Sequence, residues 1–151
     1  MTRIDFYHLQ KQSLDEVLPK LVEKAYSLNK KIKITIGNEE RVEAVNSLLW
    51  TFNDEKFIPH GSKKDGFSEM QPIFISSEND NPNNAVLLFV IDDADIDIEK
   101  ISDFERIFYI FDGNSEFSLN KARILWKALK NCDNQINYWQ QNSSGKWEQK
   151  A

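Results

Sequence analysis

The chain has 151 residues, of which 40% are hydrophobic and 28% charged, and its formal net charge is −5. This size and composition are typical of one globular domain, so we expect a single domain over residues 1–151. The acidic balance argues against a broad nucleic-acid-binding surface, which needs positive charge. The single cysteine, Cys132, excludes a disulfide within the chain, and no apolar run is long enough to span a membrane. We therefore expect a cytoplasmic protein.

Strand and helix patterns alternate through the first half of the chain. Residues 4–9 and 31–36 are rich in β-forming side chains, and each run predicts a strand. Between them, a capping-box pattern precedes apolar residues at helical spacing, which predicts a helix over residues 13–29. The same spacing predicts a second helix over residues 39–50.

The second half continues this alternation. A third helix is predicted over residues 115–131, and residues 136–140 are predicted to add an edge strand. Residues 92–103 form an acidic connector. Three strands are predicted at 72–76, 85–91 and 105–111. The whole pattern predicts an α/β fold of three layers, a mostly parallel sheet with helices on both faces.

Motifs for catalysis and for cofactors are missing from the sequence. Gly37 and Gly113 each follow a predicted strand, but no glycine-rich phosphate loop or dinucleotide fingerprint occurs. His8, His60 and Cys132 are far apart, which is a poor set for a metal. We expect no cofactor, no metal and no active site. A small-molecule enzyme on the same fold stays open as an alternative.

Residues 121–151 differ from the rest of the chain in charge. They hold six lysines and arginines against two acidic residues, a formal charge of +4, so the preceding residues carry −9. Three of the four tryptophans also fall in this segment. A basic, aromatic patch on an acidic protein indicates a docking site for an acidic partner.

The predicted helix at 115–131 arranges this charge on one side. At 100° per residue, Arg123, Lys127 and Lys130 fall within about 60° of each other, and Trp126 lies between this stripe and the core face. The core face is predicted to hold Ser118, Ala122, Leu125 and Leu129. Arginine, lysine and an indole together suit an acidic peptide with an aromatic end. A solvated lysine face, with Trp126 at the edge of the core, is the alternative.

A set of short motifs in a fixed order resembles a known family. They are Phe6-Tyr-His-Leu9, Leu48-Leu-Trp50, Phe57-Ile-Pro-His-Gly61, Gln71-Pro-Ile-Phe-Ile75, Asn81-Pro82, Phe89-Val-Ile-Asp92, Phe104-Glu-Arg106, Phe111-Asp-Gly113, Ala122-Arg123, Trp126-Lys127 and the Tyr138-Trp-Gln-Gln141 ending. Their order over nearly the full length is similar to that in the chi subunit of bacterial DNA polymerase III, most of all in its alphaproteobacterial form.

The resemblance implies a Rossmann-like fold without nucleotide chemistry and a role as an adaptor. Members of the family bind the acidic C-terminal tail of single-stranded-DNA-binding protein and link the replicase to coated template. The tail-binding arginine and lysine of the family match Arg123 and Lys127, and an aromatic position matches Trp126. Lys130 is added from the helix angle. A further basic position of some members falls at Leu119 here.

The resemblance also implies a second partner, the psi subunit of the clamp loader. The family's surface for it corresponds to Trp50, Phe57, Pro59 and His60. Another clamp-loader subunit or a helicase is the alternative partner at this surface. DNA is expected to be reached only indirectly. The alternative function is direct binding of single-stranded nucleic acid by the C-terminal basic and aromatic patch.

Overall fold

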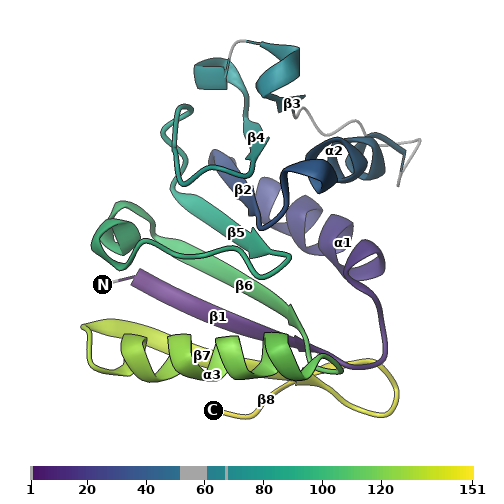
Figure 1. The fold of residues 1–151 in the computed structure, drawn as a ribbon, viewed down its shortest axis with the longest axis vertical. Helices are drawn as coiled ribbons and strands as arrows, with labels where there is room; N and C mark the ends of the chain where they lie inside the picture. The colour runs from purple at the N-terminus through teal and green to yellow at the C-terminus, as the bar shows by residue number, and fades with distance from the viewer. Residues whose placement is uncertain (1, 52–60, 67) are drawn as a thin grey trace.

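The computed structural model describes residues 2–51, 61–66 and 68–151. Within these ranges, eight strands form one sheet in the order β3-β4-β2-β5-β6-β1-β7-β8 (Figure 1). They are β1 Thr2–Leu9, β2 Ile32–Ile36, β3 Gly61–Ser62, β4 Ile73–Ser76, β5 Leu87–Ile91, β6 Arg106–Asp112, β7 Asn134–Gln141 and β8 Trp147–Gln149. All neighbouring strands run parallel except β7 and β8, which are antiparallel.

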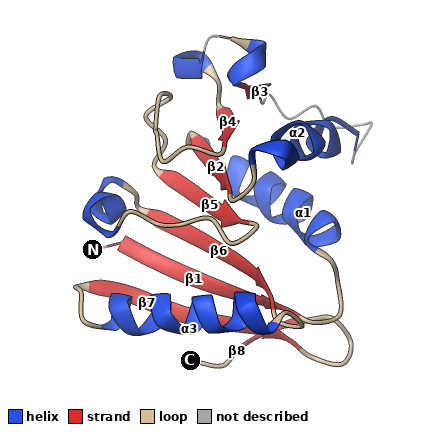
Figure 2. Ribbon diagram, in the orientation of Figure 1, coloured by secondary structure: helices blue, strands red, loops and turns tan. Residues whose placement is uncertain are grey.

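Helices cover both faces of the sheet, as predicted. The α-helices of the described ranges are α1 Leu14–Tyr26, α2 Val42–Thr51 and α3 Glu116–Lys130. Figure 2 shows α3 in front of the sheet and α1 behind it. One buried cluster joins α1 and α2 to the rear face, and a second joins α3 to the front face. The three-layer, Rossmann-like α/β prediction is confirmed. No helix in these ranges is long and apolar enough to cross a lipid bilayer.

The pattern of each strand explains where it sits. Along β1, Ile4 and Phe6 join the cluster under α3, whereas Tyr7 and Leu9 join the cluster under α1. This alternation places helices on both sides of a central strand. The uninterrupted apolar run of β5 is buried over its whole length, as expected for a strand between two parallel neighbours.

Helix α1 begins as predicted and ends earlier than predicted. The capping box between Ser13 and Glu16 is present. The helix stops at Tyr26, because the Ser27 hydroxyl donates to the Lys24 carbonyl at 2.5 Å and Asn29 adopts a left-handed conformation with φ 58°. Asparagine tolerates this conformation better than most residues, so it turns the chain toward β2.

Two predictions about the second half need correction. The predicted acidic connector contains a 3₁₀ helix at Ile98–Asp103. The Asp97 side chain caps the N-terminus of this helix, because it accepts a hydrogen bond from the Glu99 amide at 3.1 Å. The strand predicted at 136–140 exists as β7, but it is not the edge of the sheet. The turn after it, with Gly145 at φ 83°, brings β8 back as an antiparallel edge strand.

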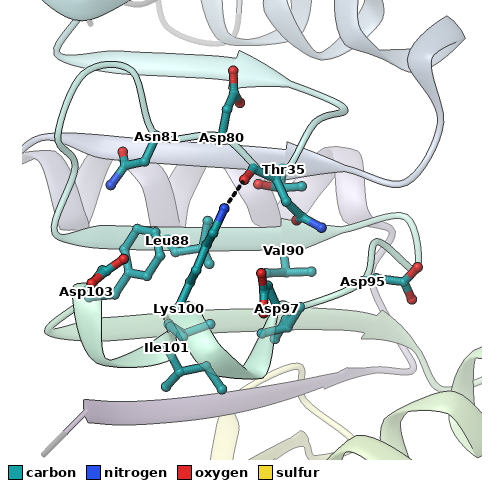
Figure 3. A pocket seen from close by; sticks show the side chains of 14 residues that line it. Thr35, Asp80, Asn81, Leu88, Val90, Asp95, Asp97, Lys100, Ile101 and Asp103 are labelled. Carbon is teal, nitrogen blue, oxygen red and sulfur yellow. Dashed lines mark hydrogen bonds between the residues drawn. The ribbon is translucent and has the colours of Figure 1, made fainter.

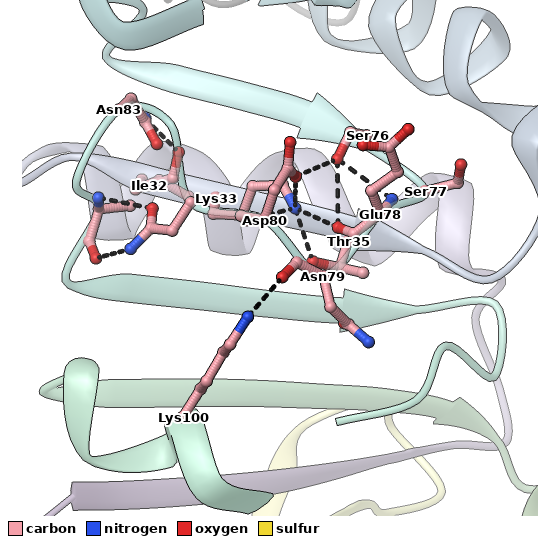
Figure 4. A network of polar contacts seen from close by, with 12 residues as sticks. Ile32, Lys33, Thr35, Ser76, Ser77, Glu78, Asn79, Asp80, Asn83 and Lys100 are labelled. Atoms are coloured by element: carbon pink, nitrogen blue, oxygen red, sulfur yellow. Dashed lines mark hydrogen bonds and ion pairs between the residues drawn. The ribbon is translucent and has the colours of Figure 1, made fainter. Parts of the chain in front are cut away.

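The buried side chain of Lys33 binds the loop after β4 to the front face of the sheet (Figure 4). Lys33 has no exposed side-chain surface, and its Nζ lies 3.1 Å from Asp80 Oδ1. It also donates to Thr35 Oγ1 at 3.1 Å and to the carbonyls of Glu78 and Asp80 at 2.7 and 3.0 Å. Burial lowers the pKa of Lys33, and the neighbouring Asp80 opposes that shift.

This lowered pKa predicts a change of stability with pH. The unfolded chain binds more protons than the folded one between the lowered pKa and the ordinary value of 10.5, so the free energy of unfolding rises with pH across that window. In Lys33→Met the rise should be absent. Urea unfolding from about pH 8 to about pH 10 measures it, with exposed Lys20→Met as the control expected to follow the wild type. Parallel curves for wild type and Lys33→Met would contradict this.

Candidate functional site

The basic stripe of α3 lies where the helix angle predicts. Ser115 caps the helix by accepting from the Ser118 amide at 3.3 Å. Of the predicted core face, Ser118, Ala122 and Leu129 are buried and Leu125 is partly buried. The side chains predicted to face solvent, Arg123, Lys127 and Lys130, are exposed. The amphipathic pattern therefore fixes the rotation of α3 on the sheet.

The four predicted site residues come together around one hollow of about 380 Å³ between α3 and β7. We call it the α3 hollow. It is lined by Leu119, Ala122, Arg123, Trp126, Lys127, Lys130, Tyr138 and Ala151. None of the described lining side chains is acidic, so these side chains offer three cations beside an apolar wall. Such a site favours an anionic ligand that also carries an apolar group.

The wall of the α3 hollow is held rigidly by aromatic packing. The Trp126 ring meets Phe6 edge-on at 5.2 Å between centroids and Tyr138 edge-on at 5.7 Å. Lys130 Nζ lies 5.7 Å from the centre of the Trp126 ring, within the range of a cation–π contact. Trp126 thus lies at the edge of the core and also forms a wall of the hollow, so a structural role in the core and a ligand-binding role for this residue are compatible.

Tyr138 is a residue of the hollow that sequence analysis missed. It was grouped with a motif whose residues point to opposite faces, since alternate residues of β7 face opposite sides of the sheet. Tyr138 joins Trp126 in the front cluster, whereas Trp139 packs against the rear cluster. The period of two along a strand is the signal that could have separated them.

A buried histidine supports Tyr138 from below. His8 Nδ1 lies 2.5 Å from the Tyr138 hydroxyl, and His8 Nε2 has no hydrogen-bond partner among the described atoms. Burial lowers the pKa of His8; Asp112 opposes the shift and Arg123 adds to it. Burial raises the pKa of Tyr138, while Arg123 lowers it. The positive charge of Arg123 therefore lowers the pKa of both His8 and Tyr138.

A second hollow, on the same face of the sheet, has the opposite charge (Figure 3). It holds about 150 Å³ over an apolar floor that includes Leu88, Val90 and Ile101. Its rim carries Asp80, Asp95, Asp97 and Asp103 around a single cation, Lys100. Lys100 donates to the Asn79 carbonyl at 3.4 Å and so bridges the two sides. Four carboxylates disfavour an acidic ligand here.

The carboxyl ends of β1 and β6 border the place where α/β folds commonly bind nucleotides. A hollow of about 730 Å³ lies there. Its acidic lining residues are Asp15, Glu16, Asp92, Asp93 and Asp112. Arg41, one of its cations, is already paired with Asp92 at 3.0 Å and Asp15 at 3.5 Å. This arrangement is unfavourable for phosphate, in line with the missing glycine-rich motifs.

The surface predicted for a second partner is only partly described. Phe57, Pro59 and His60 lie outside the described residues, and Trp50 is described only as part of the α2 backbone.

The interpretation of residues 121–151 as one patch is wrong, because their tryptophans lie on opposite faces of the sheet. Trp126 belongs to the front cluster, whereas Trp139 and Trp147 pack against the rear cluster.

Comparison with known proteins agrees with the fold and the motifs. Residues 1–137 match the family described as DNA polymerase III chi subunit, HolC. A protein of Rickettsia prowazekii (strain Madrid E) named "Probable DNA polymerase III subunit chi" is 32% identical over 154 residues, which cover 100% of this chain and 93% of the relative. The match spans more than half of the chain, so the chain belongs to the family of DNA polymerase III chi subunits, which are accessory subunits of the polymerase.

Proposed function

We propose that this accessory subunit binds the acidic C-terminal tail of single-stranded-DNA-binding protein in the α3 hollow and so links the polymerase, through the clamp-loader assembly, to coated template. The observation that carries this proposal is the convergence of Arg123, Trp126, Lys127 and Lys130 on one hollow. The resemblance noted in the sequence supplies the ligand, and the charge of the lining fits it.

Each lining group has a part in this proposal. Arg123 can fork onto a carboxylate, and Lys127 and Lys130 add positive charge along the same stripe. Trp126 and Tyr138 offer an apolar wall for the aromatic end of the tail. Leu119 adds an apolar side chain to the lining, at a position where the resemblance implies a basic residue in some relatives. The proposed contacts need no metal or cofactor.

Binding of a synthetic peptide tests this function. We expect Arg123→Ala and Lys127→Ala each to weaken binding of an acidic peptide ending in phenylalanine by about 1.5–3 kcal/mol, as is usual for charge-assisted contacts. Fluorescence anisotropy with a labelled peptide measures the affinity, which should also fall as salt concentration rises. Lys20→Ala, on the exposed side of α1, is a matched control and should bind like the wild type. Unchanged binding in the Arg123→Ala/Lys127→Ala double variant would remove the site assignment.

Direct binding of single-stranded nucleic acid is the weaker candidate. It relied on one contiguous patch of basic and tryptophan residues, but the sheet separates Trp126 from Trp139 and Trp147. The net charge of −5 also opposes a polyanion. Tight binding of a fluorescent oligonucleotide by the isolated protein would favour this candidate over the tail-binding function.

We further propose that the surface of Trp50, Phe57, Pro59 and His60 receives a second partner, either psi, another clamp-loader subunit or a helicase. This proposal rests on the family resemblance. A pull-down with the purified protein, in which the single-strand-binding protein's tail is present or deleted, separates partners held through the tail from partners held directly.

A further inference from the structure

A second cationic, aromatic groove lies on the rear face of the sheet, on the far side from α3. One wall is the end of α1 together with Leu28, which follows the helix and is 51% exposed, and the floor is formed by the side chains of Tyr7, Trp139 and Trp147. It holds about 450 Å³. Figure 2 shows β7 and β8 at the end of the sheet farthest from β3, with α1 behind the central strands. We call this site the tryptophan groove.

The floor of the tryptophan groove is a rigid set of aromatic rings. Tyr7 lies nearly parallel to Trp139 at 6.4 Å between centroids, with 12° between the planes. Trp147 from β8 meets Tyr7 edge-on at 5.1 Å. Trp139 is fixed further, because its indole Nε1 donates to Asp5 Oδ1 at 3.1 Å. Ordered rings of this kind offer apolar contact at little cost in conformational entropy.

Two arginines are held at the rim by one buried carboxylate. Asp5 has no exposed surface, and its Oδ2 lies 2.7 Å from Arg106 Nε and 3.1 Å from Arg3 Nε. The Arg106 guanidinium also stacks on Phe108, with Cζ 4.2 Å from the ring centre. The side chains of Arg3 and Arg106 remain 39% and 24% exposed. Arg106 Nη2 also donates to the Tyr7 hydroxyl at 3.2 Å. Since Asp5 engages the Nε atoms, the remaining terminal guanidinium N–H groups can donate to a ligand.

The charge of the rim identifies the class of ligand. Lys24 adds a third cation, and none of the described residues that line the groove is acidic. An anion is therefore attracted, and the rings beside it select one that carries a bulky apolar group. The remainder of the chain is acidic, so a long polyanion is repelled outside the groove, whereas a peptide with a few carboxylates is not. The ligand that fits best is a short acidic peptide.

Two of the aromatic residues of the groove lie after the residues that match the family model. The family match ends at residue 137, and both Trp139 and Trp147 follow it. The α3 hollow and the tryptophan groove also lie on opposite faces of the sheet, so they can be filled at the same time. We propose that the tryptophan groove binds a short acidic segment with a bulky apolar side chain from a partner protein, independently of the α3 hollow.

Nuclear magnetic resonance of the full chain tests this site. The probe is the blocked hexapeptide acetyl-Glu-Asp-Phe-Leu-Glu-Asp-amide, which has no free terminal carboxylate. We expect the indole N–H signals of Trp139 and Trp147 to shift on titration, with saturation at a defined affinity. The indole N–H of Trp126 should keep its position at the concentrations that saturate the groove. The same peptide with lysine in place of each acidic residue should cause no shift.

Charge reversals on opposite faces of the sheet provide a matched pair. Lys24→Glu should weaken the hexapeptide's effect on Trp139 and Trp147 by about tenfold or more, and Arg106→Gln by a similar factor. Lys127→Glu, the same change beside the α3 hollow, should leave the hexapeptide's effect on Trp139 and Trp147 unaltered. A control titration of Lys24→Glu with the phenylalanine-ended peptide should still shift Trp126, which excludes misfolding as the cause.

Three outcomes would overturn the proposal. The first is no shift of Trp139 or Trp147 at millimolar peptide. The second is a shift confined to Trp126, which would place the hexapeptide in the α3 hollow. The third is a shift of Trp139 and Trp147 by a single-stranded oligothymidine but not by the peptide, which would make the groove a nucleic-acid site.

Discussion

Asp5→Ala should lower the free energy of unfolding by about 3 kcal/mol, the low end of the range for breaking a buried ion pair, because both arginines stay partly exposed. The carboxylate is fully buried and accepts from four side chains. They are Arg106 at 2.7 Å, Arg3 at 3.1 Å, Asn137 at 2.9 Å and the Trp139 indole at 3.1 Å. Removing it leaves two cations and two N–H donors without their acceptor.

Urea unfolding followed by circular dichroism measures this loss. The matched control is Asp103→Ala, an exposed aspartate at the end of the 3₁₀ helix, which should stay within about 0.5 kcal/mol of the wild type. Asp5→Asn should fall between them, because the amide oxygen can still accept from part of the set. A loss below about 1 kcal/mol in Asp5→Ala would mean that water replaces the carboxylate, and the rigid rim of the tryptophan groove would then have no basis.

The fold was predictable because local patterns and packing agree along most of the chain. The continuous apolar run of β5 and the alternating faces of β1 each indicate a strand and its surroundings. The rotation of α3 followed from the spacing of Arg123, Lys127 and Lys130, so the cationic side of the α3 hollow was predictable as well. In each case the information lies within a few neighbouring residues.

Features that depend on distant pairing were not predictable. Asp5 sits in a β-rich run without any sign of its role, and its partners Arg106 and Asn137 are brought to it only by the pairing of β1 with β6 and β7. The edge strand β8 is three residues long, too short to give a pattern of its own. The charge of residues 121–151 suggested one patch, since a count of residues cannot tell which side of a strand each one faces.

Gly37 and Gly113 each follow a strand, and the structure shows a steric reason for a glycine at both positions. A Cβ built on Gly113 would lie 1.9 Å from His8 Nε2, so this glycine leaves room for the histidine beneath Tyr138. A Cβ built on Gly37 would lie 1.9 Å from the Asp92 carbonyl oxygen and 2.9 Å from the Ala94 nitrogen. At Gly37 the neighbours are backbone atoms, which cannot change rotamer to avoid the contact.

Gly37→Ala should therefore destabilise the protein by about 3 kcal/mol, the upper end of the range for overpacking. The turn that it would strike is already constrained, because Asp92 and Asp93 have φ of 52° and 60° and the Gly37 amide donates to the Ile91 carbonyl at 3.1 Å. Moving that turn breaks the junction between β2 and β5. Thermal and urea unfolding measure the loss.

The control is Gly145→Ala, in the turn before β8. Its φ of 83° disfavours alanine, but no atom lies within 4 Å of the added Cβ, so only the backbone cost of about 1–2 kcal/mol is expected. The comparison separates crowding from backbone strain, because Gly37 has no left-handed conformation to lose. If Gly37→Ala proved milder than Gly145→Ala, the turn at Asp92 would be able to move away from β2, and the close approach of the two strand ends would not be what requires a glycine at position 37.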